Sequence, residues 1–237
     1  MLPLLLAPLV PGAAVGLAYL VCYGGYEGPV DWAMHTDVHG SRERRRLALT
    51  FDDGPDPART PLLLDALAEL GVKATFFLLG KKVEAHPELT ARIAREGHEI
   101  GNHTYSHPYL PLASSERVAR ELAITDAIIE RATGVVPAIA RPPYGGRSPF
   151  NVRAFAKSGK RVVLWDLNSF DWKGAPADDV ARRVVERARP GSIILMHEAR
   201  DGGETTVDAV RMLVPELRAR GFELATVSRV LEPTKSD

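Results

Sequence analysis

The sequence predicts an α/β protein whose core is a parallel β-sheet, either open or closed into a barrel. From residue 47 onward, amphipathic stretches with helical spacing alternate with short apolar runs rich in branched or aromatic residues. A glycine stands between each amphipathic stretch and the next run, where it commonly ends a helix. Polar residues also gather at the ends of the apolar runs, as they do at the functional edge of parallel sheets.

The apolar runs predict about seven strands. They are residues 47–53, 72–79, 98–103, 135–142, 160–166, 192–198 and 222–228. The glycines expected to end the helices are Gly71, Gly97, Gly134, Gly159, Gly191 and Gly221. The clearest helix spans residues 114–134, where Ser114 or Ser115 can cap the start and an apolar face indicates packing.

The first 23 residues carry no charged side chain and are long enough to span a bilayer as a helix. We expect an uncleaved membrane anchor here, with contact through residues 2–23, because no basic n-region or clear cleavage site marks a signal peptide. A cleaved signal and a buried helix of the folded domain are the alternatives, and three prolines, Pro3, Pro8 and Pro11, disfavour the helix.

This pattern divides the chain into a hydrophobic segment at 1–23, a linker at 24–46, one folded domain at 47–231 and a tail at 232–237. Thirty basic and thirty acidic residues cancel, so the global charge gives no case for a nucleic-acid partner. A single cysteine, Cys22, excludes an internal disulfide. We expect a monomer in the cell envelope, anchored or exported, and the membrane orientation stays open.

Polar side chains follow five of the predicted strands. They are Asp52 and Asp53 after the first, His103 and His107 after the third, Arg141 closing the fourth, Asp166 and Asp171 after the fifth, and His197 closing the sixth. Because the carboxyl ends of parallel strands share one edge, we expect these residues to build a site. The alternative for "DDGP" is a simple strand-ending turn.

The segment "HTYSH" spaces His103 and His107 four residues apart, so both imidazoles can reach one ion if the segment is helical or tightly turned. With Asp53 they would form a site of two histidines and one carboxylate. Such a site suits catalytic zinc, and other divalent ions accept the same ligands. Two surface histidines in a loop are the alternative.

Hydrolysis also needs a base and an acid. Asp52 can serve as general base, with Arg141 as a bidentate partner that orients it and lowers its pKa. His197 can serve as general acid, with Asp171 orienting its ring. Structural ion pairs of Arg141 and Asp171 with other residues are the alternative.

Five stretches in this order, "TFDDGP", "HTYSH", "RPPYG", "DLNSFDW" and "LMH", resemble the motifs of polysaccharide deacetylases, the NodB homology domain or carbohydrate esterase family 4. The resemblance covers roughly residues 46–230. It implies a distorted (β/α) barrel of about seven parallel strands and a divalent metal, usually zinc, with cobalt, nickel or manganese possible. The implied reaction is hydrolysis of N-acetyl groups on amino sugars.

The resemblance assigns a role to each matching residue. It makes Asp52 the base, His197 the acid, Arg141 and Asp171 their partners, Asp53, His103 and His107 the metal ligands, Tyr144 the backbone donor to the oxyanion, and Trp172, Leu195 and Pro142 the substrate-binding surface. One position departs from the family pattern, since Asn168 stands where the fourth motif usually opens with an aspartate. We expect activity to survive this change.

The expected substrates are N-acetylated amino-sugar polymers such as peptidoglycan, chitin-like chains or poly-N-acetylglucosamine. An ester of acetylated xylan and a lipid-linked amino sugar are alternatives that use the same site. A non-catalytic carbohydrate-binding homologue should have lost a ligand, the base or the acid, and all are present here. A magnesium-dependent phosphohydrolase would require more carboxylate ligands and a phosphate-binding glycine loop.

Overall fold

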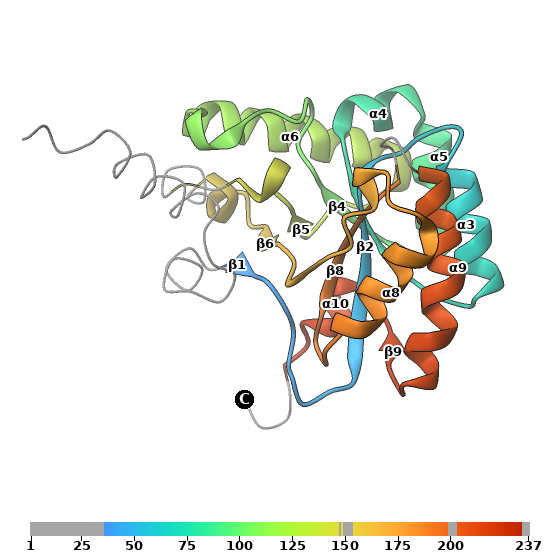
Figure 1. Cartoon of the computed structure of the whole chain (residues 1–237). Coiled ribbons are helices and arrows are strands. Elements are labelled where there is room, and N and C mark those ends of the chain that lie inside the picture. Colours follow the sequence, from blue (N-terminus) through green and yellow to red (C-terminus); the bar gives the residue numbers. More distant parts are fainter. Residues whose placement is uncertain (1–35, 147, 149–153, 199–202, 234–237) are drawn as a thin grey trace, which may run out of the picture.

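The computed structural model describes residues 36–146, 148, 154–198 and 203–233. A curved parallel sheet lies at its centre, with strands in the order β1-β6-β5-β4-β3-β2-β8-β7 and β9 beside β2 (Figure 1). The strands are β1 (Thr36–Asp37), β2 (Arg46–Gly54), β3 (Thr75–Leu78), β4 (Glu99–Asn102), β5 (Ile139–Ala140), β6 (Arg161–Val163), β7 (Leu167–Asn168), β8 (Ile193–His197) and β9 (Glu223–Leu224).

Helices pack on both faces of this sheet: α3 and α9 lie side by side on the outer face (Figure 1), and α10 packs on the inner face through Val227 and Val230. They are α3 (Thr60–Glu69), α4 (Gly80–Ala85), α5 (Pro87–Arg95), α6 (Ser115–Thr133), α8 (Ala177–Arg187), α9 (Gly203–Ala219) and α10 (Val227–Val230). Three 3₁₀ turns complete the list: η1 (Leu110–Leu112), η2 (Pro143–Gly145) and η3 (Asp171–Lys173). None of the described helices combines the length and apolarity needed to cross a bilayer.

All seven predicted strands are present, and two further strands of two residues, β1 and β7, were not predicted. A two-residue strand is too short to show a side-chain period, so the sequence pattern could not reveal it.

The strand pairings curl the sheet into a half-barrel, and a bridge between His39 and Ser192 connects its two sides near the start of β8. Part of the predicted linker belongs to this sheet, because Thr36 and Asp37 form β1 and pair with β6. The predicted hydrophobic helix at 1–23 lies outside the described residues, and the domain boundaries remain predictions.

All six glycines predicted to end helices have positive φ, and Gly134 caps α6 in the left-handed conformation. The prediction for Gly191 was wrong, because α8 ends earlier, at Arg187, with Ala188 as its C-cap. At the other end of α6, Ser114 accepts a hydrogen bond from the Arg117 N–H, as its capping role predicts.

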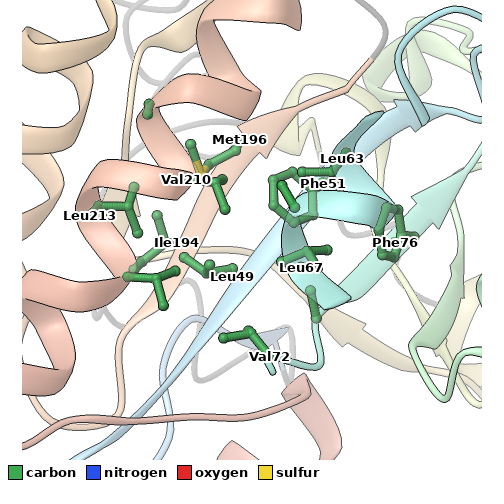
Figure 2. Packing of buried hydrophobic residues seen from close by; sticks show 14 of the residues in the cluster. Leu49, Phe51, Leu63, Leu67, Val72, Phe76, Ile194, Met196, Val210 and Leu213 are labelled. Atoms are coloured by element: carbon green, nitrogen blue, oxygen red, sulfur yellow. The ribbon is translucent and has the colours of Figure 1, made fainter. Parts of the chain in front are cut away.

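Strand alternation explains why the site lies inside the curl. On β2, Leu49 and Phe51 face the layer between the sheet and α3 and α9, where Figure 2 shows them against Leu67 and Ile194. The intervening residues of β2 therefore face the interior of the half-barrel, and the last of them is Asp52. Both faces of the strand are buried, as is typical of central parallel strands.

Buried His98 couples the packing of this sheet to pH. Its Nδ1 accepts a hydrogen bond from the Ala74 N–H at 3.1 Å, and its ring meets Phe76 edge to face at 5.3 Å. Burial, with a smaller effect of Lys73, lowers the pKa of His98 to about 4. Because the unfolded chain takes up this proton first, the contribution of His98 to stability is complete above about pH 6.5 and is lost as pH falls toward 4.

We therefore predict that His98→Asn, whose Oδ1 can still accept the Ala74 N–H, reduces acid destabilisation. Between pH 7 and pH 4 the wild type should lose on the order of 3 kcal/mol more unfolding free energy than the variant. Urea unfolding of both proteins at three pH values measures this difference. Parallel losses in the two proteins would show that folding does not lower the pKa of His98.

Candidate active site

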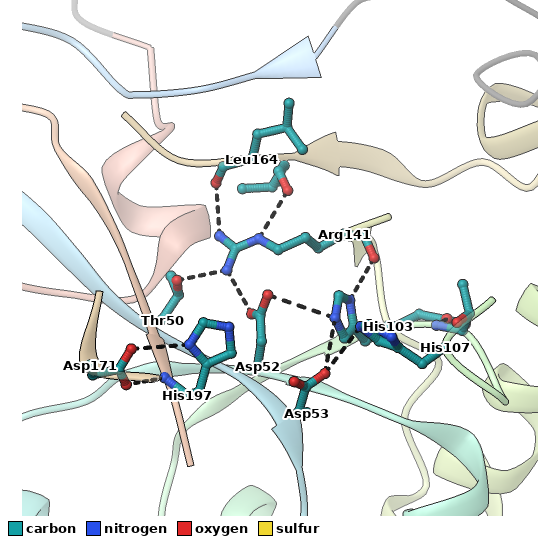
Figure 3. Close-up of polar contacts among 12 residues, drawn as sticks. Thr50, Asp52, Asp53, His103, His107, Arg141, Leu164, Asp171 and His197 are labelled. Atoms are coloured by element: carbon teal, nitrogen blue, oxygen red, sulfur yellow. Dashed lines mark hydrogen bonds and ion pairs between the residues drawn. The ribbon is translucent and has the colours of Figure 1, made fainter. Parts of the chain in front are cut away.

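A pocket of about 340 Å³ opens at the carboxyl ends of the strands. It is lined by Asp52, Asp53, His103, His107, Tyr144, Trp165, Asn168, Trp172, Leu195 and His197. Eight of the eleven residues to which the family resemblance assigns a role are among these lining residues. The other three, Arg141, Pro142 and Asp171, are buried close to the pocket, and Figure 3 shows Arg141 and Asp171 beside the base and acid that they were predicted to support.

The end of β2 brings two adjacent carboxylates into one pocket. Regular alternation would send Asp52 and Asp53 to opposite faces of the sheet. Here the register shifts between Asp52 and Gly54, and Asp53 takes a left-handed conformation with φ of 72°. This irregularity lets both carboxylates line the same pocket. A Cβ on Gly54 would lie 1.4 Å from Glu198 Oε1, so any larger residue here would force the buried Glu198 side chain to move.

The two histidines meet through a tight turn and not through a helix. Thr104 and His107 both have positive φ, 67° and 58°, in the irregular segment after β4. Glu121 on α6 fixes this turn by accepting hydrogen bonds from the N–H groups of Tyr105 and Ser106 at 2.9 and 2.8 Å. The apolar face of α6 predicted only a packing role for this helix, and no local signal in the sequence connects Glu121 to the histidines.

The ligand atoms of Asp53, His103 and His107 all lie within 4.8 Å of one another, and within the described chain this is the one cluster of its kind. Nε2 of His103 and of His107 lie 3.5 and 3.2 Å from Asp53 Oδ1. The other His103 nitrogen, Nδ1, lies 2.7 Å from the Arg141 carbonyl oxygen, so the hydrogen-bond network assigns the proton to Nδ1 and turns Nε2 toward Asp53. Two imidazoles and a carboxylate are a donor set that zinc accepts.

The electrostatics of this cluster favour a cation. Burial opposes protonation of His103, but the nearby Asp52 and Asp53 carboxylates outweigh it and raise the pKa of His103. A site whose negative charge holds an extra proton also attracts a divalent ion, which would displace that proton.

Arg141 is fully buried and holds Asp52 in place. Its Nη1 donates to Asp52 Oδ1 at 2.7 Å and to Thr50 Oγ1 at 2.8 Å. The predicted bidentate pairing was wrong, because Nε and Nη2 donate instead to the carbonyls of Val163 and Leu164 at 3.2 and 2.7 Å. These acceptors at the end of β6 fix the guanidinium plane, and with it the position of the Asp52 carboxylate.

His197 is paired with Asp171 as predicted, at 3.0 Å between Nδ1 and Oδ1. Asp171 is nearly fully buried and also accepts hydrogen bonds from the His197 N–H, Thr206 and Ser169. This pairing leaves Nε2 as the nitrogen that can exchange a proton with a molecule in the pocket. His197 and Asp52 are register partners on β8 and β2, so the candidate acid and base flank the same space.

The walls of the pocket differ in character. Leu195 is buried, whereas Tyr144 and Trp172 are 52% and 38% exposed. Tyr144 has φ of 59° in a turn closed by the Gly145 N–H donating to the Pro142 carbonyl at 3.0 Å. Its ring meets His107 edge to face at 4.5 Å, so the "RPPYG" turn is tied to the candidate ligands.

Three polar residues near the strand ends depart from the family motif or from the expectations drawn from the sequence. Asn168, the departure from the family motif, lines the pocket and accepts the Phe170 N–H at 2.8 Å, so the neutral amide still forms the local turn. Asp166 was expected at the same edge, but it binds Arg42 at 3.0 Å away from the pocket. Glu198 was not predicted; it is buried against Gly54, and burial raises its pKa to about 8.

Comparison with known proteins agrees with this architecture. The family model for polysaccharide deacetylase matches residues 39–163. A peptidoglycan-N-acetylglucosamine deacetylase from Bacillus cereus is 39% identical over 197 residues, which cover 83% of this chain and 72% of that protein. A crystal structure of a peptidoglycan N-acetylglucosamine deacetylase with a bound N-oxidanyl-benzamide superposes with a TM-score of 0.83 at 36% identity, over 88% and 99% of the two chains.

The same fold also occurs in a protein described as a pseudoenzyme. The CE4 family pseudoenzyme from Bacillus anthracis has a TM-score of 0.79 and 27% identity, over 83% of this chain and 69% of that chain. Fold alone therefore does not establish turnover. Family membership rests on the motif order, the matched family model and the aligned relatives together, and by these the chain belongs to the polysaccharide deacetylases of carbohydrate esterase family 4.

Proposed function

We propose that the protein hydrolyses N-acetyl groups of amino-sugar polymers, with peptidoglycan glycan strands as the first candidate. One observation supports this most strongly: a candidate base and acid, Asp52 and His197, stand on adjacent strands beside the Asp53–His103–His107 cluster, each held by a buried partner. A homologue that had lost turnover should lack one of these groups. The relatives named above act on peptidoglycan according to their names, which favours this substrate class.

Asp53, His103 and His107 would hold the divalent metal, zinc first, with cobalt, nickel or manganese as alternatives. When bound, such an ion lowers the pKa of a water molecule and polarises an acetyl carbonyl. The residues of the chain supply the remaining steps.

Asp52 accepts the proton of the attacking water through Oδ2, because Oδ1 is held by Arg141. The backbone N–H of Tyr144 donates to the oxygen of the tetrahedral species. His197 then gives the Nε2 proton to the amide nitrogen as the C–N bond breaks, releasing acetate and a free amine. Asp171 stabilises the protonated imidazole before this transfer. Leu195 and Trp172 form apolar walls for the acetyl methyl and the sugar.

A protein with this activity would work in the cell envelope as a monomer, reaching an N-acetylated carbohydrate and no nucleic acid. Anchoring through residues 2–23 stays a prediction, as does export. The amide and ester alternatives differ in the bond that His197 must help to break, since an ester oxygen can leave as an alkoxide, whereas an amide nitrogen must first be protonated.

Acetate release from a panel of substrates separates these alternatives. N-acetylglucosamine oligomers, peptidoglycan, acetylxylan and a lipid-linked amino sugar are each incubated with the zinc-loaded protein. The proposal expects acetate from the first two substrates. Release from acetylxylan alone would assign an esterase, and release from the lipid-linked sugar alone would move the substrate to the membrane surface.

We predict that His107→Ala weakens zinc or cobalt binding by at least about a hundredfold, because it removes one of three proposed ligands. Competition with a chromophoric chelator measures the affinity, and His86→Ala on a different loop is the matched control. An unchanged affinity in His107→Ala would place the metal elsewhere.

A further inference from the structure

A series of aromatic rings leads outward from the metal-ligand cluster on the Tyr144 side of the pocket. The rings of His107 and Tyr144 lie 4.5 Å apart, and the ring of Tyr109 lies 6.5 Å beyond Tyr144. Tyr109 is not among the described residues that line the pocket, and it is 49% exposed. Leu112, three residues further along, is 88% exposed. Exposed aromatic rings next to a pocket are typical of a ligand-binding surface.

The segment that carries these two side chains is firmly anchored. Pro108 and Leu110 are buried, and Leu110 packs in a cluster with Val118 and Leu122 of α6. Pro111 packs against the "RPPYG" turn, where a Cβ on Gly146 would lie 3.0 Å from Pro111 Cδ. Two prolines and a buried leucine thus hold the neighbouring side chains outward without help from a ligand. A surface fixed in this way loses little conformational entropy on binding.

The size of the pocket explains why a polymer needs such a surface. A volume of about 340 Å³ is near the lower end for ligand pockets and suits about one sugar residue with its acetyl group. The remaining sugars of a polymer must therefore lie on the surface outside. A sugar ring presents C–H groups on its faces and hydroxyls on its edges, which match the ring face and the phenol group of a tyrosine.

We propose that Tyr109, next to Tyr144, forms a second sugar-binding subsite that takes the neighbouring residue of the amino-sugar polymer. The nature of the polymer rests on the proposed function, whereas the subsite rests on the exposed rings and their continuity with the pocket. The subsite should add affinity only for substrates long enough to reach it, so it makes the protein selective for chain length.

Calorimetric binding of N-acetylglucosamine monomer and tetramer to the zinc-loaded protein tests the proposal, since binding is measured whether or not turnover occurs. Tyr109→Ala should weaken tetramer binding about five- to tenfold and leave monomer binding unchanged. Tyr109→Phe, which keeps the ring, should retain most of the affinity. Met212→Ala, an exposed apolar residue on α9, is the matched control and should change neither affinity.

The results separate this inference from the proposed function. Equal tetramer affinity in Tyr109→Ala and the wild type would overturn the subsite, as would an equal loss for monomer and tetramer. A wild type that binds the tetramer no better than the monomer would overturn it too. Selective loss of tetramer binding supports the subsite even if no acetate is released, a result that would count against the deacetylase assignment alone.

Discussion

Asp52→Asn is expected to lower the rate of acetate release by a factor of about 100 to 10,000, the usual contribution of a positioned general base. The asparagine oxygen can still accept the hydrogen bond that Arg141 Nη1 now donates to Oδ1, so the geometry should persist. An amide cannot take a proton from water near neutral pH. The variant should therefore bind zinc with the wild-type stoichiometry while losing turnover.

The two halves of this expectation need separate measurements. Initial rates with the N-acetylglucosamine tetramer give the loss of turnover, and a metal titration shows that the ligand cluster is intact. Asp65→Asn makes the same chemical change on the exposed side of α3 and should keep the wild-type rate. A rate within tenfold of wild type in Asp52→Asn would remove Asp52 from the role of base.

Arg141→Met is expected to lower the free energy of unfolding by about 3 to 5 kcal/mol. The substitution leaves the Asp52 carboxylate buried without its cation, and it leaves the carbonyls of Val163 and Leu164 without their donor. Adding Asp52→Asn to Arg141→Met removes the buried charge, so the double variant should recover part of the loss.

Denaturant unfolding of the single and double variants gives both values. Arg161→Met is the matched control, because its ion pair with Asp37 is half exposed, and it should cost less than about 1 kcal/mol. A loss of this small size in Arg141→Met would show that the buried pair contributes little and that Asp52 is positioned by other contacts.

The sequence predicted the strands and the site because both depend on local patterns. Helix-ending glycines and apolar runs are short-range signals, and all seven predicted strands are found. The carboxyl-edge rule then brings Asp52, His103 and His197 together although they lie far apart along the chain. The same reasoning also predicted Asp166 as a site residue, but Asp166 binds Arg42. A position at the end of a strand does not determine which polar side chain points into the pocket.

Features that depend on tertiary contacts were not predictable from one sequence. The left-handed conformation of Asp53 is unusual for an aspartate in a strand, and the sequence does not show it. Glu121 and Thr50 support the site from positions where a helix and a buried strand are the ordinary interpretation. The division of Arg141 donors among four acceptors likewise requires the ends of β2 and β6 to meet.

Reconstitution of the metal-free protein with zinc is the most direct test of the central claim that this site is a metal-dependent deacetylase. Chelated protein is titrated with zinc while acetate release from the N-acetylglucosamine tetramer is followed, with Asp52→Asn in parallel. The account predicts that acetate release rises with added zinc and saturates at one ion per chain, and that the variant binds the ion without releasing acetate. Full activity in the chelated protein, or one bound ion with no acetate from any substrate of the panel, would contradict it.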